Sequence, residues 1–279
     1  MFAGELDSVP AFRPMKLSFF LPLRQRSLIW QFSKRDVLAR YRGSLLGLGW
    51  SFVNPLLMLA IFTFVFRTIF KARWGDIEAS DLEFALRVYS GLIVFTLFTE
   101  VLNRAPRLVL DQPNLVKKVV FPLEILPWVP PLAGLFHLAL NLTLLLAATA
   151  FDRGGLPLSA LALPLVLFPL MPLLLAMGWF FAALGVYVRD IGQIMPTVSS
   201  LLMFLSPVFF HPSALPPDWQ PWLNINPLTL IIEQTRRVVL DGLWPEWGSL
   251  AVYLVLASVA AWIGGIWFQA TRKGFADVL

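Results

Sequence analysis

The sequence is poor in the residue types on which most protein chemistry depends. It contains no cysteine and only two histidines, and charged residues make up 14% of its 279 positions. Disulfides and cysteine-ligated metals are therefore excluded. The two histidines, His137 and His211, lie far apart in the sequence without obvious metal-ligating neighbours, so no metal site is predicted.

The motifs of common catalytic sites are also missing. The sequence has no GxxxxGK[ST] phosphate loop, no HExxH pair and no nucleophile elbow. It lacks the regular series of intramembrane carboxylates that a proton-driven carrier normally needs. We therefore predict a non-catalytic chain that binds no metal and no cofactor of its own. If it transports a substrate, a partner supplies the energy.

Apolar residues are what the sequence has in abundance. They make up 58% of the chain, and the mean hydropathy is +0.73. These values are typical of an all-α integral membrane protein rather than of a soluble domain. The net charge of +5 is small, and the cations cluster beside apolar runs, so we predict membrane lipid as a partner and no nucleic acid.

The apolar runs predict six transmembrane helices. The first follows a cationic cluster that ends at Arg42, and its 24 uncharged residues extend to Arg67, about 36 Å of helix. An interfacial helix is expected just before it, within an N-terminal cytoplasmic region (1–44) that precedes the transmembrane domain (45–279). The predicted spans are residues 45–67, 84–102, 124–150, 164–188, 193–211 and 248–270.

Ionisable residues limit the second and third spans. Only 12 residues separate Arg87 from Glu100, so the second span requires Arg87 to reach outward to the interface. Glu100 is then either functional or simply at the water line. In the third span His137 and Asn141 share one helical face, which is more typical of interhelical hydrogen bonding than of a catalytic or ligand-binding role.

The distribution of lysine and arginine predicts the orientation. With six spans both termini lie on one side, and that side carries 15 of the 22 cations. The positive-inside rule therefore places both termini in the cytoplasm. The segment 211–247, rich in proline and tryptophan, then faces outward, where we expect re-entrant or surface helices that gate the exit or bind a periplasmic partner.

Four ordered segments carry a resemblance to a known family. They are RDVLARYRGSLLGLGWSFVNPLLML, NLVKKVVFPLEILP, YVRDIGQIMP, and LSPVFF followed by LNINPLTLIIE. Together they resemble the membrane subunits (permeases) of type-2 ABC exporters for lipid-linked bacterial polysaccharides, such as O-antigen, teichoic acid and capsule. The resemblance covers residues 27–240.

This resemblance implies an assembly and a location. The permease would be a homodimer of six-span subunits in the bacterial cytoplasmic (inner) membrane, joined to two copies of a cytoplasmic ABC ATPase that binds ATP and Mg. The cargo would be a polysaccharide linked to polyprenyl (undecaprenyl) pyrophosphate. Two alternatives remain: an integral-membrane transferase acting on a polyprenyl-linked sugar through Glu100, Glu124 and His137, and a type-2 ABC permease for a drug or small lipid.

The resemblance also implies a cytoplasmic coupling helix at about 104–116 that docks on the ATPase. Pro106 is placed to begin such a helix and Pro113 to end it. The residues implied in coupling are Arg104, Arg107, Leu110, Asp111 and Leu115.

Two further sets of residues are candidates for contact with the cargo. The channel is expected to present aromatic faces from the first and fifth spans, and the alternative for each side chain is packing or contact with lipid. These candidates are Phe52, Phe62, Phe66, Phe204, Phe209 and Phe210. Arg35, Arg40 and Arg42 are either topology signals alone or also bind the lipid pyrophosphate, since arginine forks match phosphate oxygens.

Overall fold

The computed structural model describes the chain except for residues 1–16, 21, 44–45, 66–73, 75–79 and 118–120. The described part is helical and contains no strand. Its principal helices are α1 (Leu17–Phe20), α2 (Arg26–Tyr41), α3 (Trp50–Thr63), α4 (Asp81–Arg104), α5 (Pro113–Val116), α6 (Val129–Arg153), α7 (Leu163–Leu167), α8 (Leu170–Tyr187), α9 (Ile191–Leu205), α10 (Gln220–Leu223), α11 (Pro227–Val239), α12 (Trp247–Thr271) and α13 (Phe275–Val278).

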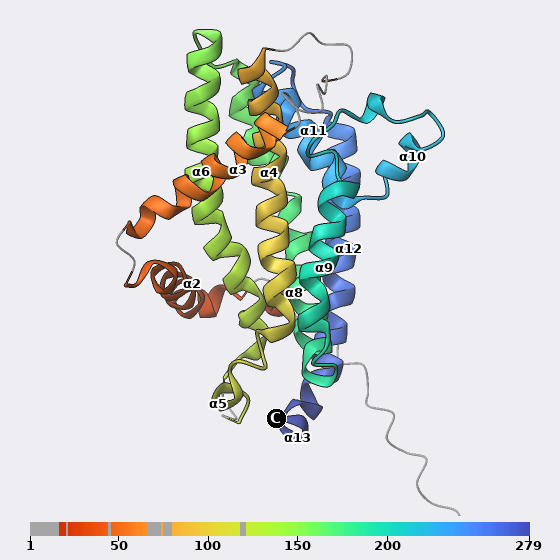
Figure 1. Cartoon of the computed structure of the whole chain (residues 1–279). Helices are drawn as coiled ribbons and strands as arrows, with labels where there is room; N and C mark the ends of the chain where they lie inside the picture. Colours follow the sequence, from red (N-terminus) through yellow and green to blue (C-terminus); the bar gives the residue numbers. More distant parts are fainter. Residues whose placement is uncertain (1–16, 21, 44–45, 66–73, 75–79, 118–120) are drawn as a thin grey trace, which may run out of the picture.

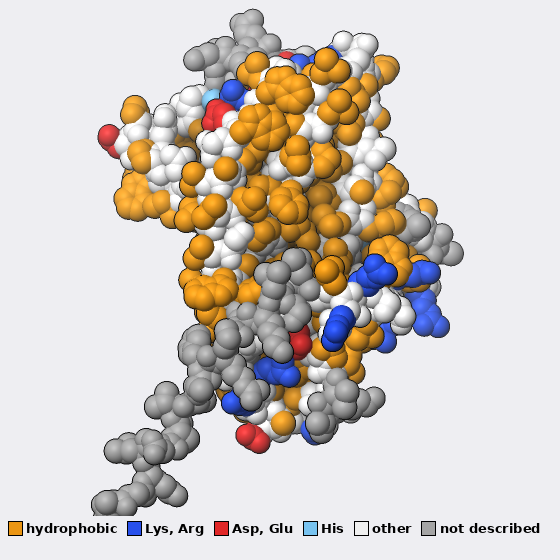
Figure 2. Space-filling model, turned by 180° about the vertical axis from the view of Figure 1, so that it is seen from behind, with side chains coloured by type: hydrophobic (Ala, Val, Ile, Leu, Met, Phe, Trp, Pro, Cys, Tyr) orange, Lys and Arg blue, Asp and Glu red, His pale blue; other side chains and the backbone are white. Residues whose placement is uncertain are grey.

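Four helical stretches are long and apolar enough to cross a membrane: Asp81–Arg107, Leu123–Arg153, Leu158–Tyr187 and Trp247–Val278. They coincide with the second, third, fourth and sixth predicted spans. Figure 2 shows a broad band of hydrophobic side chains across the middle of one face, with Lys and Arg gathered toward one end. The chain is thus a multi-pass membrane protein.

The first and fifth predicted spans coincide with shorter apolar helices. In the described chain α3 has 14 residues and α9 has 15, or about 21 and 22 Å. Helix α9 ends at Leu205 rather than near residue 211, because Ser206 precedes Pro207 and adopts an extended conformation. Figure 1 shows α3 running obliquely across the upright helices, while α2 lies across the bundle.

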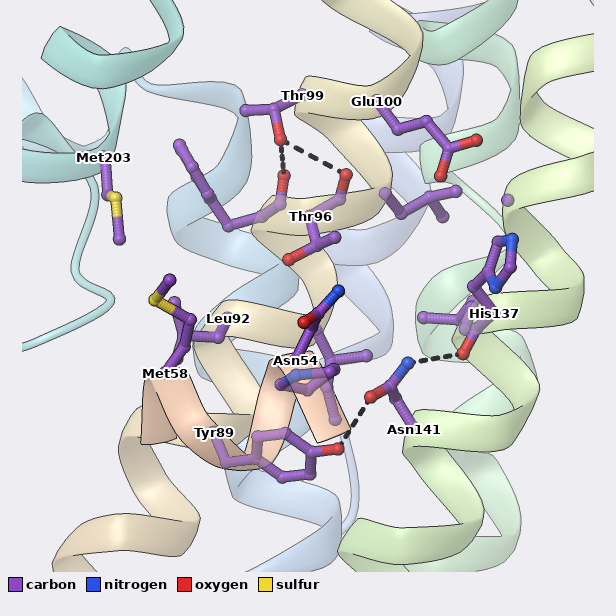
Figure 3. Close-up of a pocket in the computed structure, with 16 residues that line it drawn as sticks. Asn54, Met58, Tyr89, Leu92, Thr96, Thr99, Glu100, His137, Asn141 and Met203 are labelled. Atoms are coloured by element: carbon purple, nitrogen blue, oxygen red, sulfur yellow. Dashed lines mark hydrogen bonds between the residues drawn. The ribbon is translucent and has the colours of Figure 1, made fainter. Parts of the chain in front are cut away.

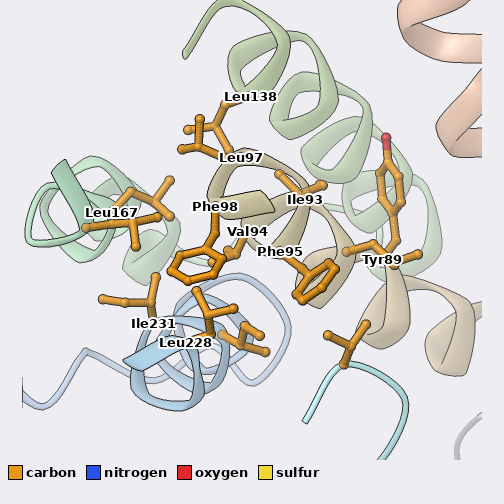
Figure 4. Close-up of a cluster of buried hydrophobic side chains, with 14 of the residues drawn as sticks. Tyr89, Ile93, Val94, Phe95, Leu97, Phe98, Leu138, Leu167, Leu228 and Ile231 are labelled. Atoms are coloured by element: carbon orange, nitrogen blue, oxygen red, sulfur yellow. The ribbon is translucent and has the colours of Figure 1, made fainter. Parts of the chain in front are cut away.

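Helix α4 is the centre of the core. A Ser80 cap opens it, with the hydroxyl accepting a hydrogen bond from the Glu83 amide at 3.1 Å. Phe95 and Phe98 of this helix pack against side chains of α6, α7 and α11 (Figure 4). The prediction that Arg87 reaches outward was wrong. Its side chain is 5% exposed and lies 2.9 Å from carboxylate oxygens of both Glu83 and Asp241, which makes burial tolerable.

Glycines allow α8 to pack closely against α12 and against the polar segment that follows α4. Helix α8 packs along α12, where a Cβ on Gly264 would lie 2.7 Å from the Ala176 carbonyl oxygen. On α8 itself, Gly185 lies against the carbonyl of Pro106, leaving no room for a side chain. This second contact ties α8 to the polar segment after α4.

That polar segment is not the single helix predicted over 104–116. Helix α4 continues into a 3-10 turn at Ala105–Arg107, turns follow, and α5 is a separate four-residue helix. Pro113 opens α5 rather than closing a helix, since proline lacks an amide hydrogen and suits a first helical turn. The segment lies near α13 and the C-terminus at one end of the bundle (Figure 1).

Helices α10 and α11 lie toward the opposite end, where α11 packs in the bundle and α10 stands on a loop that projects from its side (Figure 1). The Asn226 side chain caps α11 by accepting from the Leu228 amide at 2.9 Å. Leu228, Ile231 and Ile232 are fully buried. Helix α11 is therefore part of the core and not a surface helix.

Candidate functional site

A cavity of about 430 Å³ lies among α3, α4 and α6, at the middle of the bundle. Its lining is mostly hydrocarbon, including Met58, Leu92 and Met203, but polar side chains also reach it (Figure 3). The polar lining residues are Asn54, Tyr89, Thr96, Thr99, Glu100, His137 and Asn141. A cavity of this kind can bind a largely apolar ligand and orient it through a few hydrogen bonds.

Hydrogen bonds hold part of this polar lining in place. The Tyr89 hydroxyl donates to the Asn141 side-chain oxygen at 2.7 Å, and the Asn141 amide donates to the His137 carbonyl at 2.7 Å. The Tyr41 hydroxyl lies 2.9 Å from His137 Nδ1 and also contacts Ser51. These bonds join α2, α3, α4 and α6, which confirms the prediction that His137 and Asn141 serve interhelical hydrogen bonding.

Four charged residues form an ion cluster where α2 meets the end of α4. Arg40 pairs with Glu100, and Arg104 Nη1 donates to Asp36 Oδ2 at 2.7 Å. Arg104 also lies 3.4 Å from Glu100. Two cations and two anions thus neutralise one another, and they connect the helix that lies across the bundle to the start of the polar segment.

A polar hollow of about 440 Å³ lies between this segment and the start of α9. Arg104, Arg107 and Asp111, three of the five residues predicted to couple to an ATPase, line it together with Asn103 and Gly192. Arg107 and Asp111 are exposed. The other two predicted residues, Leu110 and Leu115, are half-buried.

The three arginines predicted to bind a pyrophosphate have different surroundings. Arg40 is engaged by carboxylates of the ion cluster. The Arg35 guanidinium lies 5.5 Å from the centre of the Phe32 ring, and Arg42 is exposed at the end of α2. Arg35 and Arg42 are thus exposed, while Arg40 has anionic partners, and their role in binding a pyrophosphate stays a prediction.

The phenylalanines predicted to line the channel differ in how exposed their side chains are. Phe204 is 67% exposed on α9, whereas Phe209 is 4% exposed and belongs to the core. Phe52 and Phe210 are half-buried. These four described side chains do not line the cavity. Phe66 and the Phe62 side chain lie outside the described part of the structure.

The structure brings together two of the three residues that a transferase site would require. Glu100 and His137 both reach the cavity, but Glu124 lies elsewhere, 3.0 Å from Arg272. Glu100 is itself paired with two arginines. The described residues therefore do not gather this acid and base set at one reaction centre.

One structurally important residue was missed by the sequence reasoning. Arg236 on α11 is 1% exposed. Its guanidinium donates to the carbonyls of Arg87, Pro207 and Val208 at 2.6–3.0 Å. It also pairs with Glu233 at 2.7 Å and lies over the Trp74 ring. Burial lowers the pKa of Arg236, while Glu233 opposes that shift.

The fold and cavity define a helical multi-pass membrane protein with a mostly apolar cavity between its helices and a polar segment at one end. Comparison with family models gives the particular family. Residues 27–240 match the ABC-2 type transporter family, and the chain belongs to this family.

Named relatives align along most of their length. An O-antigen export system permease protein RfbA of Myxococcus xanthus is 25% identical over 259 residues, which cover 90% of this chain and 95% of the relative. An RfbA of Klebsiella pneumoniae is 20% identical over 249 residues, 88% and 93% of the two chains. A polysialic acid transport protein KpsM of Escherichia coli is 24% identical over 240 residues, 86% and 91% of the two chains.

Proposed function

We propose that this chain is the channel-forming subunit of an ATP-driven exporter that moves a polyprenyl-linked polysaccharide across the bacterial inner membrane. The observation that carries the proposal is the family match along residues 27–240, together with relatives named for O-antigen export and polysialic acid transport. The sequence has no phosphate loop, so a partner ATPase binds the ATP and Mg.

The exposed faces of the two short helices support a homodimer. Leu57 and Ile61 on α3, and Leu201 and Phe204 on α9, are large hydrophobic side chains that are more than half exposed. Helix α9, about 22 Å long, does not by itself cover a bilayer core of about 30 Å. A second copy packed against them would enclose the cavity, with two ATPase subunits on the cytoplasmic side.

The polar segment and its hollow are the proposed docking site for the ATPase. Arg107 and Asp111 are exposed beside the hollow. Because the Pro106 carbonyl packs closely on Gly185, a displacement of this segment by the ATPase would also displace α8. The hydrogen bond from Arg104 to Asp36 would transmit the same displacement to α2. Both termini are then cytoplasmic, in agreement with the excess of Lys and Arg on that side.

The cavity suits a substrate with both apolar and polar parts. Its hydrocarbon walls accommodate a polyprenyl chain or the apolar faces of sugar rings, while Asn54, Tyr89 and Asn141 offer groups for hydroxyls. Arg35 and Arg42, which are exposed, would bind the lipid pyrophosphate at the cytoplasmic surface of the membrane. The relatives named for O-antigen export and polysialic acid transport favour a sugar-bearing cargo over a drug or small lipid.

The test is ATPase activity in lipid nanodiscs, with this chain alone and with its cognate ATPase subunit. We expect no hydrolysis by the chain alone, a stable complex with the partner, and weaker assembly in Arg107→Ala and Leu110→Ala variants. A matched Arg153→Ala change, at the far end of α6, should have no effect. Failure to bind the cognate ATPase would overturn the proposal.

A further inference from the structure

A second hollow, of about 610 Å³, lies between α10, α11 and α12, at the end of the bundle opposite α13 (Figure 1). In contrast to the mostly hydrocarbon membrane cavity, its wall combines many polar groups with apolar side chains such as Val252 and Leu256. The amide, carboxylate and hydroxyl groups belong to Gln220, Asn224, Asn226, Thr229, Glu233, Gln234, Asp241, Glu246, Ser249 and Tyr253, and His211 and Arg237 also line the hollow. We call this hollow the outer cleft.

The carboxylates of the outer cleft are already paired. Glu233 lies 2.7 Å from Arg236, Asp241 lies 2.9 Å from Arg87, and Glu246 lies 3.2 Å from Arg237. A cationic ligand would find each of these three carboxylates already engaged, and an anionic ligand would find Arg237, which also lines the cleft, already engaged by Glu246. The cleft is thus built for a polar ligand without charge.

Two polar groups in the cleft are available to such a ligand. The Tyr253 hydroxyl is buried and has no hydrogen-bond partner within the described chain, which is costly unless a ligand or water satisfies it. Asn224 is exposed, and its amide can both donate and accept. Trp219 and Trp222 precede Asn224 closely in the sequence, are 63% and 66% exposed, and offer flat apolar faces at the α10 side of the cleft.

We propose that the outer cleft binds uncharged sugar residues of the polysaccharide after they cross the membrane. Sugar hydroxyls both donate and accept hydrogen bonds, so they can pair with the amides, hydroxyls and carboxylates of the cleft. The C–H face of a pyranose ring can pack on an exposed indole. This inference rests on the proposed export function, because that function places the cleft on the outer side and supplies the saccharide.

The test uses the full chain in nanodiscs, without an ATPase, and ligand-observed NMR to measure binding of soluble trisaccharides. The probes are neutral trimers of mannose, glucose and N-acetylglucosamine, with a sialic acid trimer as the charged comparison. We expect at least one neutral trimer to bind, and the acidic trimer to bind about tenfold more weakly, an energy difference of about 1.4 kcal/mol.

Two variants locate the binding. Tyr253→Phe and Asn224→Ala should each weaken it by about three- to tenfold, the effect of one lost hydrogen bond. Tyr187→Phe is the matched control at the other end of the molecule, where the hydroxyl donates to the Thr271 carbonyl. Thermal unfolding of each variant verifies that the fold is intact. Absence of binding by all neutral trimers, or binding by both cleft variants as strong as that of the unmodified chain, would overturn the inference.

This result is separable from the test of the proposed function. If no sugar binds but the ATPase complex assembles, only the proposal that the outer cleft binds sugar is overturned. Sugar binding without assembly of any ATPase complex would overturn the exporter and leave the cleft as a saccharide site.

Discussion

Arg40 of α2 forms an ion pair with Glu100 of α4, although 60 residues separate them in the sequence. The pair lies where the membrane cavity meets the polar segment, and Arg104 joins it through Glu100 and Asp36. It therefore connects the proposed docking site to a residue that lines the cavity.

We predict that Glu100→Gln assembles with the ATPase but exports poorly. Neutralising Glu100 leaves two arginines near a single carboxylate, so α2 and α4 no longer move as one unit. ATP hydrolysis should persist while export falls about fivefold or more. The charge-reversed pair Arg40→Glu with Glu100→Arg should recover part of the loss. The control is Arg26→Gln, an exposed cation at the start of α2, and an equal loss in this control would contradict the prediction.

Replacing the buried Arg236 should strongly destabilise the fold. Arg236→Leu leaves three carbonyls without their donor and Glu233 without its partner, at a cost of about 3–5 kcal/mol. Its neighbour Arg237 is 37% exposed, and Arg237→Leu should cost about 1 kcal/mol or less. Denaturant unfolding in detergent measures both. Similar midpoints for the two variants would show that Arg236 does not hold α11 to α4.

Gly185 is predicted to be essential for attachment of the ATPase. Because a Cβ at this position would clash with the Pro106 carbonyl, Gly185→Ala should displace the turn that carries Arg107. Co-purification of the ATPase should fall, while insertion into the membrane remains. Gly155→Ala, where a Cβ meets no atom within 4 Å, should behave as the unmodified chain.

Phe204 and Phe209 should respond differently to truncation. Phe209 belongs to the core, so Phe209→Ala should lower the free energy of unfolding by about 3–5 kcal/mol. Phe204 is exposed on α9, so Phe204→Ala should leave stability unchanged and reduce dimerisation or export. Unfolding midpoints, cross-linking between α9 helices and export measure these effects. A stability loss in Phe204→Ala equal to that in Phe209→Ala would be the contrary result.

Composition and hydropathy were sufficient to predict much of the fold. The long uncharged runs predicted the membrane helices around α6, α8 and α12, because the bilayer requires about 20 apolar residues for each span. The four matching segments predicted the family, since their order and spacing are specific.

Long-range pairing could not be predicted from the sequence. Arg87 was expected at the interface because nothing local shows that Asp241 would meet it inside the bundle. Arg236 was counted only as a cation, although its carbonyl partners come from α4 and from the residues after α9. The predicted coupling helix is a series of turns followed by α5, because Pro113 opens a new helix and the Pro106 carbonyl packs on Gly185 of α8, a contact that no local sequence pattern shows.

The most direct test is to delete the gene for this chain in its native host and to measure polysaccharide on both sides of the inner membrane. The account predicts that lipid-linked polysaccharide accumulates inside and disappears from the surface, and that the intact chain restores export only with an active partner ATPase. Unchanged surface polysaccharide in the deletion strain would contradict the central claim.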